Sequence, residues 1–145
     1  MKRLERTQRI PAEQASLWEF LIDLDNLPRW QSGVESVELT TPGPIAIGSV
    51  AHVRRTLMGQ ALAVDLRVTA LEPGRLLSLT SEASGFKVEA ALTLSPSDGA
   101  TELSFGMTVS ASNPFMGAVE GMVASAADQD IATSLDRLRT LFTKE

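Results

Sequence analysis

The feature that most constrains this chain is a long amphipathic pattern near its C-terminal end. Asn113 and Pro114 favour a helix start, because the Asn side chain can accept a free N–H and proline has no N–H to leave unpaired. Apolar residues then recur every three or four positions: Met116, Val119, Val123, Ala127, Ile131, Leu135, Leu138 and Phe142. This spacing predicts a helix over residues 114–142 with one apolar face, about 40 Å long at ~1.5 Å per residue. The face requires a partner of similar length.

The middle of the chain predicts that partner, because its apolar residues alternate with polar ones as in half-buried antiparallel strands. Six strands are expected, at residues 34–41, 49–57, 62–69, 77–83, 88–94 and 103–109. Turn sequences such as Pro42-Gly43-Pro44 and Ser97-Asp98-Gly99 separate them and predict an antiparallel meander. One layer of sheet against one helix is therefore expected.

The N-terminal part adds a seventh strand and two short helices. Residues 3–10 read as a strand that ends before Pro11, and residues 11–23 as a helix. Residues 25–30 read as a shorter helix or turn closed by Gly33. The prediction is one α+β domain over residues 1–145, in which a curved seven-stranded antiparallel sheet wraps around the long C-terminal helix.

Composition excludes several classes of function. Among 145 residues, 18 are acidic and 13 basic, and the net charge of −5 disfavours a nucleic-acid partner. With no cysteine and one histidine, neither thiolate chemistry nor a multi-histidine metal site is expected, and no cofactor is predicted. No segment approaches the ~20 apolar residues of a membrane span, so a cytoplasmic protein without an integral membrane segment is expected. Oligomeric state stays open.

Several segments, in their order and spacing, resemble a known superfamily. They are IPAEQASLWEFLID at residues 10–23, LPRW at 27–30, IGS at 47–49, VTALEPGRLL at 68–77 and DGATEL at 98–103. Together with the C-terminal helix they resemble the SRPBCC superfamily of START-like and Bet v-like proteins, in particular its bacterial polyketide cyclase/dehydrase branch. The resemblance implies a helix-grip fold with a pocket between sheet and helix. It leaves function open, because members include lipid carriers, quinone-binding proteins, aromatase/cyclases and chaperone co-activators.

Small inward positions in the predicted strands, such as Ala51, Ala63 and Ala90, have two interpretations. They could leave a cavity beside the helix, or let sheet and helix approach closely. Glu120 is the most informative polar residue, because it lies near the middle of the apolar stripe. We expect it to line the pocket and bind a polar group or act as acid or base. A helix end that protrudes beyond the sheet would instead leave it in water.

Adjacent arginines on a strand must point to opposite faces. If Ala51 and Val53 face inward, Arg55 enters the pocket, where it could pair with Glu120 or bind an anionic head group. In the other register Arg54 does so, and a strand end in water would place both outside. His52 is expected on the outer face.

The remaining ligand-binding candidates are apolar or aromatic. Trp30 could close one side of the pocket with its indole N–H on a polar atom, although core packing is the expected role of such a residue. The other predicted lining residues are Leu66, Leu79, Phe105, Met107, Met116, Met122, Val119 and Val123. Met58 and Gly59 could form a lid.

Three functions fit these features. The leading hypothesis is binding of a small hydrophobic ligand, of lipid, polyketide or quinone type, between the sheet and the C-terminal helix. The second is a polyketide cyclase/aromatase-like enzyme that uses Glu120 for proton transfer. The third is a protein-interaction module. Whether any reaction is catalysed is left open.

Overall fold

The computed structural model describes residues 2–41, 43–57, 59–83, 86–111 and 117–143. Its elements are β1 (Lys2–Ile10), α1 (Gln14–Ile22), the short 3₁₀ helix η1 (Leu24–Asn26), α2 (Leu27–Trp30), β2 (Val34–Leu39), β3 (Val50–Leu57), β4 (Gln60–Glu72), β5 (Leu76–Ala83), β6 (Phe86–Ser97), β7 (Ala100–Ala111) and α3 (Gly117–Thr143). The expected order of elements is confirmed. The predicted helix start at Asn113 and Pro114 falls outside the described residues.

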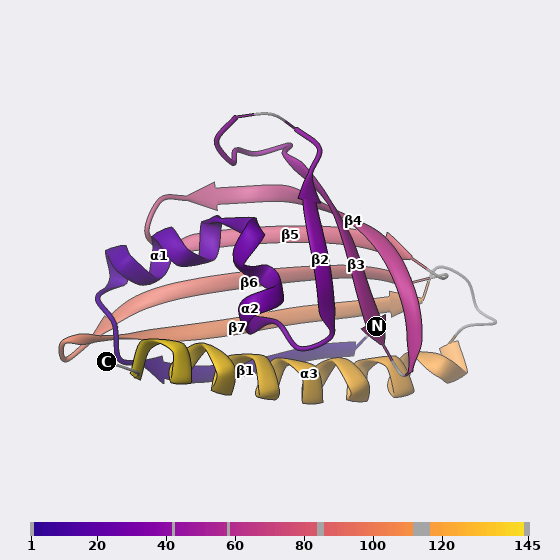
Figure 1. Cartoon of the computed structure of the whole chain (residues 1–145). Coiled ribbons are helices and arrows are strands. Elements are labelled where there is room, and N and C mark those ends of the chain that lie inside the picture. Colours follow the sequence, from indigo (N-terminus) through magenta and orange to yellow (C-terminus); the bar gives the residue numbers. More distant parts are fainter. Residues whose placement is uncertain (1, 42, 58, 84–85, 112–116, 144–145) are drawn as a thin grey trace.

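The strands form one antiparallel sheet in the order β1-β7-β6-β5-β4-β3-β2. The last six strands are a meander, and β1 joins the far edge beside β7, where Arg6 lies opposite Phe105. Register shifts interrupt β2–β3 pairing between Val34 and Ser36 and β4–β5 pairing between Val68 and Ala70. Such bulges bend a sheet, and here they accompany its curvature around α3 (Figure 1).

The helix-grip architecture follows from the burial of one face of α3. The helix runs along the inner side of the sheet, close to β1 (Figure 1). On this face Ile131, Leu135 and Leu138 are buried with residues of the sheet such as Leu103. The predicted apolar stripe is therefore confirmed over the described part of α3. Among the described residues, no helix is long and apolar enough to cross a membrane.

The short helices close one end of the structure against the sheet and α3. Leu17, Trp18 and Leu21 are the buried residues of α1, and Leu27 and Trp30 those of α2. Phe20 meets Phe142 of α3 edge to face at 5.4 Å between ring centroids. What the sequence predicts as one second helix is a 3₁₀ turn followed by α2, because Pro28 can occupy only the first turn of a helix.

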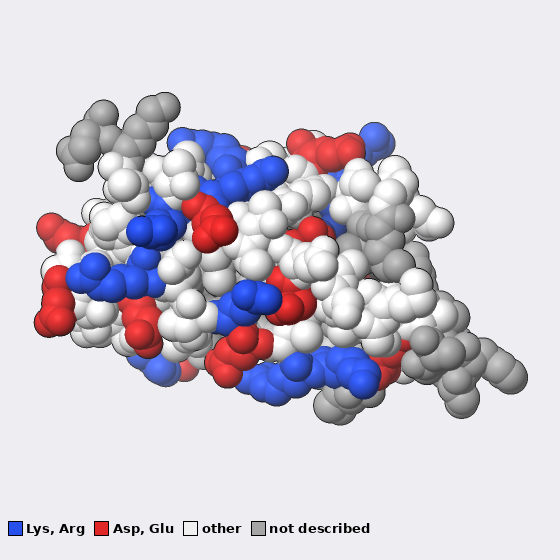
Figure 2. Space-filling view, turned by 90° about the horizontal axis from the view of Figure 1, so that it is seen from below, with Lys and Arg blue, Asp and Glu red and all other residues white. Residues whose placement is uncertain are grey.

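Polar contacts join α3 to the edge strand on the outside. Arg6 donates two hydrogen bonds to Asp128, at 2.8 and 2.9 Å, and Gln8 donates one to Asp136. Figure 2 shows acidic and basic side chains interspersed on the face viewed from below. Where the structure describes this face, it offers no broad positive surface of the kind that binds nucleic acid.

We predict that Leu138→Ala lowers the free energy of unfolding by about 2–5 kcal/mol, because Leu138 is fully buried and its loss leaves a cavity between α3 and the sheet. Urea denaturation measures the effect. Arg139→Ala, at the next and exposed position, should stay within about 0.5 kcal/mol of wild type. Equal effects of the two substitutions would contradict this account of the core.

Candidate functional site

An apolar cavity of about 400 Å³ lies between the sheet and α3. Its walls come from α2, from the inner faces of strands β2 to β7, and from Val119, Val123, Ala127 and Ile131 of α3. Most of its lining side chains are aliphatic or aromatic. Its size and lining are those of small-molecule sites in proteins, which typically enclose about 300–1,000 Å³.

The cavity brings together most of the residues expected to line a pocket. These are Arg55, Leu66, Leu79, Phe105, Met107, Val119 and Val123. Trp30 and Glu120 are not among the lining residues, and Met116 lies outside the described residues. The role of each in ligand binding stays a prediction.

The polar end of the cavity is an ion pair between β3 and α3. Arg55 Nη2 lies 3.2 Å from Asp130 Oδ2, and the two side chains are 21% and 30% exposed. Ala51 and Val53 are buried, so the inward register of β3 turns Arg55 inward and leaves Arg54 exposed. The partner of Arg55 is Asp130, not Glu120 as considered from the sequence. Arg55 Nε is buried and has no hydrogen-bond partner among the described residues.

Burial opposes the charges of this pair. Desolvation lowers the pKa of Arg55 although Asp130 acts in the other direction. Desolvation likewise raises the pKa of Asp130, against the opposing effects of Arg55 and a hydrogen bond from Ser32. For both groups the loss of water outweighs their mutual attraction. A pair of this kind contributes little to stability compared with apolar residues of similar volume, which points to a role in the cavity.

Asp130 was not among the residues predicted from the sequence, although a signal for it exists. Val123, Ala127, Asp130 and Ser134 are spaced by four, three and four residues, so one helix face carries all of them into the cavity wall. Leu27, Gln31 and Gln60 also line the cavity and were missed. They belong to α2, the segment after it and the first residue of β4, whose approach to the cavity depends on the tertiary structure.

The segment after α2 fixes the position of the pair. The Ser32 amide donates to Ser134 Oγ at 2.8 Å, and that hydroxyl donates to the Asp130 carbonyl at 2.6 Å. Gly33 follows with φ of +87°, and the Thr56 amide donates to its carbonyl at 2.7 Å. A Cβ on Gly33 would lie 2.7 Å from the Thr56 carbonyl oxygen and 3.3 Å from Arg55 Nη2. Only glycine lets the backbone approach this closely.

Glu120 lies on the buried side of α3, 8% exposed, but serves a different contact. Its carboxylate accepts a hydrogen bond of 2.8 Å from the Ala111 amide at the end of β7. Hydrogen bonds to the carboxylate, this one among them, lower the pKa of Glu120, and nearby positive charge adds to them. A lowered pKa keeps the group ionised near neutral pH, whereas a general acid needs a raised one.

The structure also places the other residues that the sequence analysis discussed. Trp30 is 1% exposed and packs edge to face on Phe105, while its Nε1 has no partner among the described residues. His52 lies on the outer face, as expected, and its Nδ1 lies 2.8 Å from Asp65 Oδ1. Met122 is 59% exposed, so its inclusion in the pocket lining is wrong, because it lies one position before the inward Val123. Met58 falls outside the described residues, and Gly59 is exposed.

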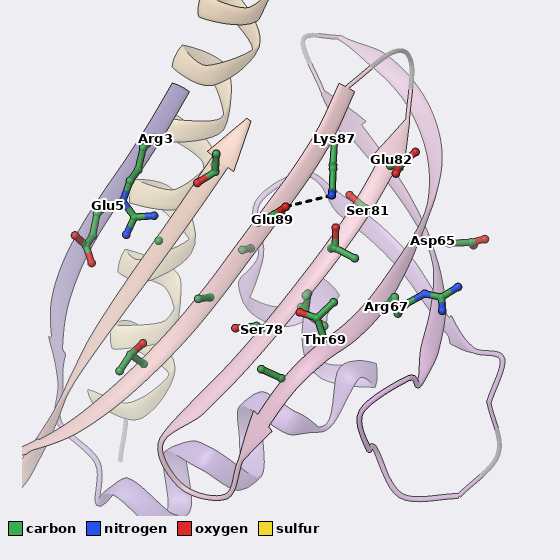
Figure 3. Close-up of a pocket in the computed structure, with 18 of the residues that line it drawn as sticks. Arg3, Glu5, Asp65, Arg67, Thr69, Ser78, Ser81, Glu82, Lys87 and Glu89 are labelled. Atoms are coloured by element: carbon green, nitrogen blue, oxygen red, sulfur yellow. Dashed lines mark ion pairs between the residues drawn. The ribbon is translucent and has the colours of Figure 1, made fainter. Parts of the chain in front are cut away.

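A second hollow, of about 740 Å³, lies on the outer face of the sheet. Its labelled residues come from strands β1, β4, β5 and β6 and carry both charges, with Arg3 and Glu5 on one side and Asp65 and Arg67 on the other (Figure 3). Lys87 and Glu89 pair within it at 3.3 Å. The hollow lacks the apolar walls that would supply affinity for a hydrophobic ligand. Among the described residues, no cluster of His, Cys, Asp and Glu could hold a metal ion in either place.

Comparison with protein families shows which family the chain belongs to. Residues 1–143 match the family described as polyketide cyclase / dehydrase and lipid transport. The chain belongs to this family. The resemblance stated from the sequence is thereby confirmed, and the family includes proteins that bind ligands and proteins of the cyclase/dehydrase type. A search of curated proteins gave no match.

Solved structures share the fold of this family member at low sequence identity. A protein from Thermus thermophilus is 17% identical with a TM-score of 0.81, over 99% of this chain and all of its own. The Zhui aromatase/cyclase from Streptomyces sp. R1128 is 14% identical with a TM-score of 0.78, over 98% of this chain and 93% of its own. A START superfamily protein from Mycobacterium smegmatis is 16% identical with a TM-score of 0.77, over 96% and 98%. These similarities confirm the helix-grip fold.

We predict that Gly33→Ala destabilises the protein more than Gly48→Ala does. Both glycines have positive φ, +87° and +95°, which costs a residue with a Cβ about 1–2 kcal/mol. At Gly48 no atom lies within 4 Å of the added Cβ, whereas at Gly33 the Cβ meets the Thr56 carbonyl. The extra cost at Gly33, about 1–3 kcal/mol for displaced backbone, is measured as the difference between the two free energies of unfolding. Equal losses would contradict the close approach.

Proposed function

We propose that this protein binds a small, largely hydrophobic molecule in the cavity between the sheet and α3. The observation that carries the proposal is the apolar cavity of about 400 Å³ with one polar end, formed by Arg55 and Asp130. Membership of a family described by polyketide cyclisation and lipid transport supports it. Ligands of lipid, polyketide or quinone type all combine apolar bulk with a few polar atoms.

The energetics are favourable for such a ligand. A molecule that buries about 300 Å² of apolar surface gains about 7.5 kcal/mol at ~25 cal/mol per Å². Part of this gain offsets the entropy lost on association. The apolar walls therefore supply affinity, whereas the few polar groups at one end orient the ligand.

The cavity also bears on the protein-interaction alternative. Such a module needs a filled core and an exposed apolar patch. Here the exposed large apolar residues among those described are Leu39, Ile47 and Met122, on β2, the segment before β3, and α3. Three exposed apolar side chains on these elements are few for a docking surface, so the ligand-binding proposal has more support.

The proposal predicts that filling the cavity abolishes binding without unfolding the protein. Ala127→Phe places a ring in the cavity from α3, whereas Ser125→Phe adds the same ring at an exposed position. Affinity for the uncharged dye Nile red, measured by fluorescence titration, should fall at least about tenfold in the first variant, equivalent to ~1.4 kcal/mol. It should stay close to wild type in the second. Unchanged binding in Ala127→Phe with an intact thermal transition would refute the proposal.

A second candidate function is proton transfer on a bound polyketone. Asp130 favours it, because desolvation raises the pKa of a carboxyl group that lines the cavity beside Arg55. A carboxyl of this kind can donate or accept a proton nearer neutral pH than a solvated one. Glu120, the residue first considered for this role, bonds to the Ala111 amide and is not among the cavity-lining residues.

If the protein catalyses cyclisation, we expect Asp130→Asn to slow it about 10²–10⁴-fold, the usual contribution of a positioned acid or base. Mass spectrometry of the products of a linear polyketone, against the uncatalysed reaction, measures the rate. Asp128→Asn is the matched control, because Asp128 lies two positions earlier on α3 and pairs with Arg6 on the outer surface. Equal rates in the two variants would eliminate Asp130 as the acid or base.

A further inference from the structure

We infer that the cavity selects uncharged ligands with a carbonyl group over carboxylates of the same apolar shape, because Asp130 already neutralises the arginine that binds the head group. This inference rests on the proposed ligand-binding function and specifies the chemical class of the ligand. It makes Arg55 the donor to the ligand and Asp130 the residue that sets the preferred charge.

Arg55 has N–H groups beyond the one that bonds to Asp130. Its side chain is 21% exposed and lines the cavity, and its Nη2 bonds to Asp130. Its Nε is fully buried, so the donors within reach of a ligand are on the terminal nitrogens of the guanidinium. A ligand oxygen can accept a charge-assisted hydrogen bond from them. A purely hydrocarbon ligand would cover these donors without giving them an acceptor.

The charges of the cavity wall also favour an uncharged ligand. Of the described residues that line the cavity, only Arg55 and Asp130 are ionisable, and their charges cancel. A carboxylate would add a net negative charge to a space of low polarity and would be repelled by Asp130. A carbonyl oxygen accepts the same hydrogen bond with a much smaller loss of hydration and leaves the pair intact.

Neither Arg55 nor Asp130 is free to move away from the other. Asp130 lies on α3 one turn before Ser134, whose hydroxyl is bonded to both the Asp130 carbonyl and the Ser32 amide. The Gly33 backbone lies against the guanidinium, since a Cβ there would be 3.3 Å from Nη2. Asp130 therefore stays beside Arg55 when a ligand enters. The other polar lining residues, among them Gln31 and Gln60, are uncharged and can bind a second neutral group.

Displacement of Nile red by two matched probes tests the inference. The probes are a methyl ketone and a carboxylate that carry the same undecyl chain, at a pH where the free acid is ionised. In the wild-type protein the ketone should bind at least about tenfold more tightly, equivalent to ~1.4 kcal/mol. In Asp130→Asn, Arg55 keeps its charge without compensation, so the carboxylate should gain at least about tenfold while the ketone changes by less than about threefold.

Matched variants separate this effect from general disturbance. Asp128→Asn removes a carboxylate from the outer face of the same helix and should keep the wild-type preference. Arg55→Met should weaken the ketone, whereas Arg54→Met, at the exposed neighbour, should not. If Arg55→Met unfolds because Asp130 is left unpaired, the double variant Arg55→Met/Asp130→Leu removes both charges and should bind the ketone no more tightly than a hydrocarbon of the same length.

The outcomes distinguish the inference from the function on which it rests. If Nile red and both probes bind but their ratio is the same in wild type and Asp130→Asn, the charge selection is overturned and ligand binding stands. If neither the dye nor either probe binds the wild-type protein, the ligand-binding proposal fails and the inference fails with it. Tighter binding of the carboxylate by the wild-type protein would also overturn the selection.

Discussion

Burial of the apolar face of α3 against the curved sheet is the interaction on which the rest of this structure depends. Its side chains change in size along the helix. Leu135, Leu138 and Phe142 in the second half are large and meet the sheet and the short helices directly. The cavity-facing residues of the first half, Val123 and Ala127, are smaller. A straight helix against a sheet of fixed curvature therefore leaves space only where its side chains are small, which accounts for the position of the cavity.

The Arg55–Asp130 pair is the principal departure from an apolar interior. Two charged groups that lose water gain less from each other than from hydration, and the directions of their pKa shifts show this for both. The Arg6–Asp128 pair on the surface behaves differently, because mutual hydrogen bonding raises the pKa of Arg6 and lowers that of Asp128. The buried pair therefore contributes little to stability, and its effect is to place polar groups at one end of a largely apolar cavity.

The sequence predicts the architecture well because its signals are local. Period-two alternation predicts six strands, a helical stripe predicts α3, and these leave few ways to assemble one sheet and one long helix. Alternation also indicates correctly that Arg55 faces inward if Ala51 and Val53 do. The unpredicted part of the site depends on contacts far apart in sequence. Arg55 and Asp130 are 75 residues apart, so the helical spacing that places Asp130 on the cavity face of α3 does not reveal that Arg55 of β3 lies opposite it.

Glu120 also shows that the sequence predicts burial better than it predicts contacts. Its place on the apolar stripe indicates burial, which is found, but burial alone does not determine what a carboxylate contacts. Hydrogen bonds to the carboxylate, among them the one from the Ala111 amide at the end of β7, keep it charged, so the pKa falls instead of rising. A stripe position gives the direction in which a side chain points. Its chemical state depends on the donor it meets there.

Apolar walls discriminate poorly between ligands, because one methylene group changes affinity by only about 1–3 kcal/mol. A buried polar group discriminates more strongly, since a ligand that fails to satisfy it leaves it unpaired. In this cavity the selective groups are few and lie at one end, around Arg55 and Asp130. Proteins at 14% to 17% identity share the helix-grip fold with this chain. The fold alone therefore does not determine the ligand, and the ligand class has to be inferred from the polar residues of the cavity.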